Sequence, residues 1–322
     1  MTFDDHELDN NWADEIPQDP DKQTADAFRA RRKAAFQAYY EHMPLRRESL
    51  PHGLDMRLYR RVRYGRLASV HVLDTRQYRS DQPRDLAGAN DPARSMTGWE
   101  QEQRLVNGMA GSGSRWNLLA NQTMVASNDR RAGPGQVYDF DNWDGYRVQR
   151  RRLMEFFGSG RTSNPVVLTG DRHKTWVCDL KPDFEDENSP VVGAEITGTS
   201  ISSAGDEDQA RSHEIYGPIM AESPHWKYID ARRGYLLCDV TADRMLTSLR
   251  TVSTRTLAGS HDLDGGPVRR GERTTGHPGG IGAGLAFGDG PAYTGTSAHR
   301  ARSTLPVRRF NGWWKRLGRV SR

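Results

Sequence analysis

Residues 164–173 read Asn-Pro-Val-Val-Leu-Thr-Gly-Asp-Arg-His. The residues from Val166 to Thr169 are apolar or β-branched, and they stand between Pro165 and Gly170. This composition is typical of a short buried strand. Because ligands of α/β folds bind at the carboxyl ends of strands, the residues that follow this strand are the first candidates for a functional site.

Asp171 and His173 follow this strand and lie two positions apart. In extended backbone, positions i and i+2 point the same way, so a carboxylate and an imidazole would converge just outside the sheet. The pair is therefore a candidate for metal binding or for acid–base chemistry. The alternative is a surface turn with two ordinary polar residues, and this short pattern alone does not decide between them.

The charge of the chain is unevenly distributed. The 322 residues carry a net charge of +4, but residues 268–322 contain 11 Lys and Arg against 2 Asp and Glu, a net of +9. Residues 1–267 therefore carry −5, since 4 − 9 = −5. The basic pI of about 9.1 belongs to the tail, so it does not indicate that the body binds nucleic acid, and we expect no nucleic-acid partner.

Other features narrow the class of protein. The apolar content is 35%, and no run approaches the roughly 18 apolar residues of a membrane span. Cys178 and Cys238 lie inside strand-like runs and suggest small buried apolar residues more than a disulfide framework. Met1 is not followed by a basic and then apolar segment, so we predict no signal peptide in this chain.

Hydrophobic periodicity predicts the secondary structure. The clearest helix spans residues 24–43, with Thr24 as its cap and an apolar stripe inward. Its Arg29, Arg31, Arg32 and Lys33 are expected to face solvent. Tyr64-Gly65 is expected to turn a hairpin. Two further helices are expected at 99–110 and 146–157, and strands at 57–63, 66–73, 115–126, 165–169, 175–180, 191–197, 226–230, 234–241 and 245–253.

Helices alternate with strands early in the chain, and strands dominate later. This order favours an α/β fold with a mixed sheet or paired sheets over residues 1–266. Residues 267–322 are rich in Gly and Arg and are expected to be disordered. Within them, residues 310–320 place aromatic and basic side chains at helical spacing, which we attribute to chance, and we predict no membrane contact there.

A second candidate cluster lies at the start of the chain. Residues 4–7 read Asp-Asp-His-Glu, and like the Asp171/His173 pair they give carboxylates beside an imidazole. Two such clusters at strand ends are what a di- or trinuclear hydrolase site needs. Asn121, near the end of another predicted strand, could add a carbonyl oxygen, which suits a hard cation such as Ca²⁺.

Five segments, taken together and in order, resemble the alkaline phosphatase D (PhoD-like) family. They are residues 2–11 (TFDDHELDNN), 73–79 (LDTRQYR), 168–173 (LTGDRH), 198–203 (GTSISS) and 225–235, which contains HWKY and RGY. The resemblance covers residues 1–266 and the carboxyl-terminal part of that family's metallophosphatase domain. It implies a two-sheet β-sandwich flanked by helices, of the calcineurin-like superfamily, and here amino-terminally incomplete.

The resemblance also implies roles for individual residues. Asp5 matches a metal-binding Asn of the superfamily, and His6 matches the adjacent His that contacts the transferring phosphoryl group. Asp171 and His173 match the two His of a Gly-His-x-His motif, and Asn121 matches a position that is His in relatives. Oxygen ligands at Asp5, Asn121 and Asp171 would suit Ca²⁺, and His173 would serve Fe³⁺.

Arg76 and Arg79 are candidates to hold an anionic substrate, and salt bridges to nearby carboxylates are the equal alternative. The resemblance implies a metal-dependent phosphoesterase that acts on phosphate mono- or diesters. Family members are typically exported. Segments that carry the family's first metal ligands are absent from this chain, so the other hypothesis is a truncated, non-catalytic remnant with a partial metal site.

Overall fold

The computed structural model describes residues 1–203, 209–252, 261–262, 266–267, 283–286 and 301–306. The chain divides into two compact units. The first comprises residues 1–198 and 205–231, and the second comprises residues 199–204 and 232–322. The domain boundary expected at residue 266 stays a prediction.

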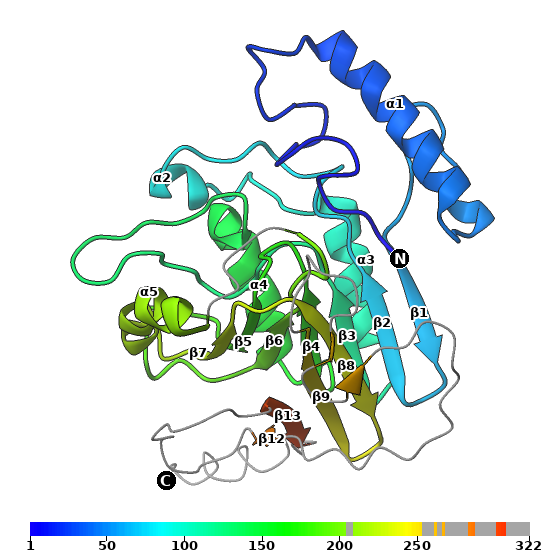
Figure 1. Ribbon diagram of the computed structural model, residues 1–322. Coiled ribbons are helices and arrows are strands. Elements are labelled where there is room, and N and C mark those ends of the chain that lie inside the picture. The colour runs from blue at the N-terminus through cyan, green and yellow to red at the C-terminus, as the bar shows by residue number, and fades with distance from the viewer. Residues whose placement is uncertain (204–208, 253–260, 263–265, 268–282, 287–300, 307–322) are drawn as a thin grey trace, which may run out of the picture. The chain divides into compact units, whose positions relative to one another are not determined.

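A seven-stranded sheet forms the centre of the first unit, with the strand order β1-β2-β3-β4-β6-β5-β7 (Figure 1). Strands β2, β3, β4 and β6 run parallel, whereas β1, β5 and β7 pair antiparallel with their neighbours. The strands are β1 (Arg60–Tyr64), β2 (Ala68–Val72), β3 (Trp116–Ala120), β4 (Pro165–Thr169), β5 (Thr175–Leu180), β6 (Gly193–Thr197) and β7 (Trp226–Asp230).

The central position of β4 explains its composition. Val166 and Val167 point to opposite faces of the sheet and are 2% and 0% exposed, so both faces of the strand are covered. A strand covered on both sides needs a continuous apolar run, and this is what residues 166–169 provide. By contrast, β1 lies at the sheet edge, and its residues are half-buried or exposed.

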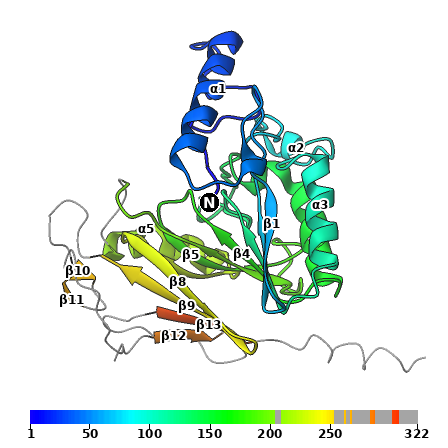
Figure 2. The same ribbon diagram turned by 90° about the vertical axis from the view of Figure 1, so that its right-hand side faces the viewer.

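Helices α3 (Trp99–Ala110) and α4 (Arg147–Gly158) bury their apolar stripes against the sheet. Figure 2 shows α3 running along one face of the strands. One hydrophobic cluster joins side chains of both helices to the strands, including Leu105, Met109, Leu153, Met154, Phe157, Leu119 and Val167. Two shorter helices, α2 (Leu86–Ala89) and the 3₁₀ helix η2 (Trp143–Tyr146), precede α4.

Residues 1–58 form their own aromatic cluster around helix α1 (Ala25–His42), followed by the 3₁₀ helix η1 (Arg47–Ser49). Thr24 caps α1, since its hydroxyl accepts a hydrogen bond from the Ala27 N–H. The buried members of the cluster are Phe3, Leu8, Trp12, Phe28, Phe36, Tyr39, Met56 and Leu58.

Two predictions for α1 were wrong in detail. Arg32, expected to face solvent, is only 2% exposed, and Met43, whose helical spacing from Phe36, Tyr39 and Tyr40 put it on the apolar stripe expected inward, is 36% exposed. Arg32 lies four residues from both Phe28 and Phe36, so it falls on the buried stripe. Its guanidinium lies 5.3 Å from the Trp12 ring centre and 5.2 Å from that of Phe36 and donates to the Asp14 carbonyl, which offsets the cost of burial.

The second unit contains a four-stranded sheet in the order β12-β13-β9-β8. Its strands are β8 (Gly234–Val240), β9 (Arg244–Thr251), β12 (Ala283–Ala286) and β13 (Ala301–Pro306), and β10 (His261–Asp262) pairs with β11 (Gly266–Pro267). Thus the segment 267–322, expected to lack regular structure, contributes two strands to this sheet. The rest of that segment, including the amphipathic run at 310–320, lies outside the described residues.

The expected α/β class is confirmed, and the described residues form a seven-stranded sheet, a four-stranded sheet and the two-stranded pairing of β10 with β11. The predicted strands at 165–169, 175–180 and 226–230 and the helix at 99–110 agree residue for residue with the structure. The strand expected at 115–126 is shorter, and helix α5 (Gln209–Glu222), which contains Pro218, was missed. Across the described residues, none of the helices combines the length and the apolar character that crossing a membrane requires.

Candidate metal centre

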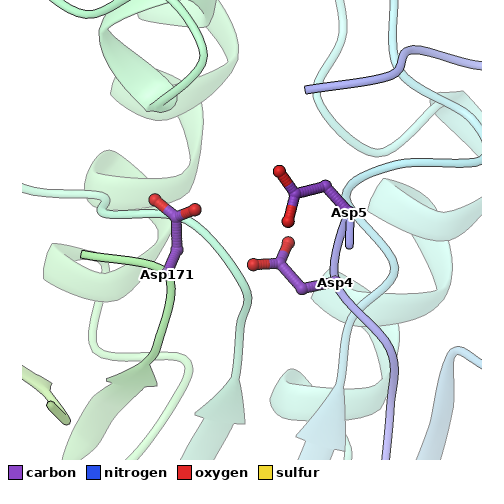
Figure 3. Close-up of side chains that lie close together, drawn as sticks. All are labelled: Asp4, Asp5 and Asp171. Carbon is purple, nitrogen blue, oxygen red and sulfur yellow. The ribbon is translucent and has the colours of Figure 1, made fainter. Parts of the chain in front are cut away.

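Three carboxylates converge beyond the carboxyl end of β4. Asp4 and Asp5 reach this point from the amino-terminal segment, and Asp171 reaches it from the turn after β4 (Figure 3). One oxygen from each side chain lies within 4.8 Å of the other two. Calcium–oxygen bonds measure about 2.3–2.6 Å, so ligand oxygens on one ion are at most about 5 Å apart. The three oxygens therefore already lie at the spacing of a shared cation.

The turn after β4 differs from the extended geometry that the sequence suggested. Asp171 has φ of 66° and His173 has φ of 51°, so both adopt the left-handed conformation. The Gly170 N–H donates to the Gln122 carbonyl, which holds the start of the turn. Asp171 turns into the cluster, whereas His173 is exposed and is not part of it. The expectation of extended backbone at these two residues was therefore wrong.

Asp5 is held in place by its own neighbours in the chain. Its carboxylate accepts hydrogen bonds from the backbone N–H groups of His6 and Asn11, at 2.8 and 3.0 Å. Phe3 and Leu8, on either side, are buried in the aromatic cluster of residues 1–58. This packing anchors the segment and leaves Asp5 only 3% exposed. The His6 side chain is exposed and lies outside the carboxylate cluster.

Arg76 neutralises part of the negative charge of the cluster. Its side chain is fully buried and pairs with Asp4 at 2.7 Å and with Asp141 at 2.9 Å. The same guanidinium lies 3.9 Å from Asp5 and 3.6 Å from Asp171. One arginine thus contacts four carboxylates.

Arg79 fastens the amino-terminal segment to the same centre. It donates to the Asn11 and Trp12 carbonyls at 2.8 Å, and it pairs with Asp141 at 2.7 Å. The salt bridges offered as the alternative role for Arg76 and Arg79 are therefore present. Direct contact of either arginine with a substrate stays a prediction.

Burial and mutual repulsion perturb the acids strongly. Burial raises the pKa of Asp171 to about 7, with Asp4 adding to the rise and Arg76 and Arg172 opposing it. Burial likewise raises the pKa of Asp4 to about 6, opposed by Arg76. For Asp141, burial is outweighed by Arg76 and Arg79, which lower its pKa to about 2. Burial disfavours the charge on Arg76, but its acidic neighbours raise its pKa above the usual range.

Asn121 lies in a buried hydrogen-bond network beside the centre. Its Oδ1 accepts from the Trp143 indole N–H at 3.3 Å, and its Nδ2 donates to Thr169 Oγ1 at 3.3 Å. Thr169 in turn donates to the buried Glu195 at 2.6 Å. Asn121 is thus held rigidly, and its role as a metal ligand stays a prediction.

The donor set fits a hard divalent cation. Asp4, Asp5, Asp141 and Asp171 carry four negative charges, and Arg76 and Arg79 carry two positive charges, which leaves −2. Carboxylate oxygens are the ligands that Ca²⁺ prefers. A cation would also stabilise the ionised form of Asp4 and Asp171, whose protons are held unusually tightly without one. The two histidines predicted at the site are not in this ligand set.

Sequence reasoning did not assign roles to two residues of the centre. Asp4 stands in the predicted acidic cluster, but its neighbour Asp5 was chosen as the ligand. Asp141 lies in an irregular segment between β3 and α4, where spacing carries no signal. Only its contacts with Arg76 and Arg79 show that it belongs here.

Comparisons with known proteins agree with this geometry. The family model described as PhoD-like phosphatase matches residues 1–249. The chain is 44% identical over 258 residues to alkaline phosphatase D of Bacillus subtilis (strain 168), covering 78% of this chain and 44% of that protein. A solved chain titled "Structure of PhoD" superposes with a TM-score of 0.75 at 43% identity, covering 80% of this chain and 50% of that one.

The chain belongs to the PhoD-like phosphatase family. It spans about half the length of the relatives that it matches.

Proposed function

We propose that this protein is a metal-dependent phosphoesterase that hydrolyses phosphate mono- or diesters. The observation that carries the proposal is the carboxylate cluster of Asp4, Asp5 and Asp171 at the end of β4, within a chain of the PhoD-like phosphatase family. Alkaline phosphatase D, the relative at 44% identity, is named for this class of reaction.

The three carboxylates would hold a hard cation, for which we propose Ca²⁺. A bound cation would polarise a phosphoryl oxygen and offset the charge that develops on it. We further propose that His173 serves an Fe³⁺ ion and that Asn121 adds an oxygen ligand. For His173 this requires a side chain that is now exposed to turn toward the centre.

Residues of the chain supply positioning and proton transfer. The exposed imidazole of His6 follows Asp5 directly and is our candidate to contact the phosphoryl group and move a proton. Arg76 and Arg79 hold Asp4, Asp141 and the carbonyls of residues 11 and 12 in place. Through these contacts the two arginines would keep the amino-terminal segment and the segment of Asp141 in fixed positions around the site. Their positive charge would also attract an anionic ester.

The second candidate function is metal binding without hydrolysis. It is supported by the composition of the cluster. Among the described residues, the cluster contains three carboxylates, and neither His6 nor His173 belongs to it. If only these carboxylates bind metal, the proposed Fe³⁺ ion has no nitrogen ligand. The two candidates differ in one measurable property, the release of phosphate.

The deciding experiment is hydrolysis of p-nitrophenyl phosphate and bis(p-nitrophenyl) phosphate by the purified chain, with Ca²⁺ and Fe³⁺ supplied. Asp171→Asn and His173→Ala are measured beside it, together with Ca²⁺ binding by calorimetry. Hydrolysis that both substitutions abolish supports the phosphoesterase. Ca²⁺ binding that Asp171→Asn weakens, with no hydrolysis by any variant, supports the second candidate and rejects the first.

A further inference from the structure

Beside the acidic cluster, one carboxylate holds two arginines together. The Arg172 guanidinium donates to Asp139 Oδ2 at 3.0 Å, and that of Arg130 lies 3.7 Å from the same oxygen. Arg172 is the residue directly after Asp171, so this pair of positive charges lies next to the proposed metal centre. The side chains of Arg172 and Arg130 are 16% and 54% exposed, so solvent reaches both.

The segment that carries Arg130 and Asp139 is firmly anchored. Residues 129–141 form a loop closed by a hydrogen bond from the Arg130 N–H to the Val137 carbonyl at 2.8 Å. At its tip the Gly133 N–H donates to the Glu222 carboxylate. At its end Tyr138 lies 4.4 Å under the Arg147 guanidinium, and Asp141 pairs with Arg76. The loop therefore presents its charges at a defined place.

Neither guanidinium is saturated by Asp139. Each arginine has five N–H donors in a planar fork, a geometry that matches carboxylate and phosphate groups. The Nε–H of Arg172 has no hydrogen-bond partner within the described part of the chain. Both guanidiniums face the same oxygen of Asp139. This is the arrangement that would bind an anionic group of a ligand, and in this structure the Asp139 carboxylate takes the place of such a group.

We propose that Arg130 and Arg172 form a second anion subsite, which recognises a carboxylate or phosphate that the substrate carries in addition to its scissile ester. The proposal rests on the phosphoesterase function proposed above and names the substrate class: esters whose leaving group is itself anionic. Asp139 holds the two arginines ready and gives way when that anion binds. An uncharged leaving group makes no use of the subsite.

The first test compares phenyl phosphate with 4-carboxyphenyl phosphate, which differ by one remote negative charge. For each variant the ratio of kcat/KM for the charged over the uncharged ester is measured, so that general losses of activity cancel. Arg172→Gln is expected to lower this ratio about tenfold and Arg130→Gln about threefold. Arg131→Gln is the matched control, because this exposed arginine of the same loop lies beside Gly135. Equal ratios in all four proteins would overturn the proposal.

Asp139→Asn separates recognition from a structural role. If Asp139 competes with the substrate's anion, removing its charge raises the ratio severalfold. If the Arg–Asp pairs only fasten the loop, the substitution lowers kcat/KM for both esters and leaves the ratio unchanged, and the subsite is rejected.

A binding measurement distinguishes failure of this proposal from failure of the phosphoesterase function. In the presence of Ca²⁺, calorimetry compares phenylphosphonate, 4-carboxyphenylphosphonate and 1,4-phenylenediphosphonate, none of which can be hydrolysed. The wild type is expected to bind the two doubly anionic probes at least fivefold more tightly, and Arg172→Gln to lose that preference. The probe with the larger gain identifies the second group. Equal binding of all three probes overturns the subsite, whether or not either ester is hydrolysed.

Discussion

Two buried acidic sites lie at neighbouring strands of the same sheet and are stabilised in opposite ways. Glu195, in β6, is fully buried and accepts hydrogen bonds from the Val125 and Ala126 N–H groups and from the Thr169 hydroxyl. These hydrogen-bond donors are all neutral groups. The cluster beyond β4 instead gathers four carboxylates on two arginines, with two negative charges in excess.

The difference separates a structural acid from a functional one. When neutral donors already satisfy a carboxylate, a ligand can form no further hydrogen bond or ion pair with it. The role left to this network is to hold the loop after β3 in place. Negative charges in excess repel one another and destabilise the folded protein. A cation that binds between them removes this repulsion, and the free energy regained strengthens its binding. Four measurements test whether the two acidic sites differ in this way.

The largest effect is expected from Arg76→Met. It leaves Asp4 and Asp141 without their main counter-charge, and breaking a buried pair costs about 3–5 kcal/mol. Chemical denaturation should show the free energy of unfolding fall by about this amount in the absence of metal. Added Ca²⁺ should restore part of it. A loss below about 1 kcal/mol would mean that the arginine is not the main counter-ion.

Glu195→Met tests the neutral network. Three buried donors lose their acceptor, each unsatisfied group costing about 1–3 kcal/mol, and relief of the buried charge offsets part of this. We expect a net loss of about 2–3 kcal/mol in the free energy of unfolding. The dissociation constant for Ca²⁺ should change less than threefold. A large loss of Ca²⁺ affinity would place Glu195 within the metal centre.

The pH dependence of stability tests the excess charge. The folded-state pKa of Asp171 is raised to about 7 and that of Asp4 to about 6, from 3.8. The folded protein therefore holds more protons than the unfolded chain between these values, so stability falls as pH rises from about 4 to 7. Unfolding of the metal-free protein, measured at a series of pH values, should show this loss of stability. Asp171→Asn should remove most of the slope, and an unchanged slope would contradict the assignment.

The smallest effect is expected at the surface. Arg104 pairs with Glu100 at 3.0 Å on α3, with side chains 50% and 71% exposed. Such pairs contribute about 0.3–0.5 kcal/mol. Arg104→Ala should lower the free energy of unfolding by no more than this, measured beside Arg76→Met. If Arg104→Ala and Arg76→Met lowered the free energy of unfolding by similar amounts, the contribution of an ion pair would not depend on whether it is buried or exposed.

Sequence patterns predicted most of the first unit and part of the site. The strand 165–169 and the helix 99–110 follow from apolar periodicity, because each buries a regular face. Asp5 and Asp171, predicted as metal ligands, lie in the one carboxylate cluster found among the described residues. Arg32 and α5 were misjudged, since burial of a guanidinium between two rings and a helix that contains proline are decided by tertiary contacts.

The α/β class, the central buried strand, the family and the candidate residues at the strand ends can be read from the amino-acid sequence alone. These depend on local composition and on motifs that can be read in order along the chain. Only the tertiary structure decided which acids share a centre, because Asp4, Arg76, Asp141 and Asp171 are brought together from four separate segments. The fold also sets the left-handed backbone of Asp171 and His173 after β4, which depends on how the turn packs and not on residue spacing.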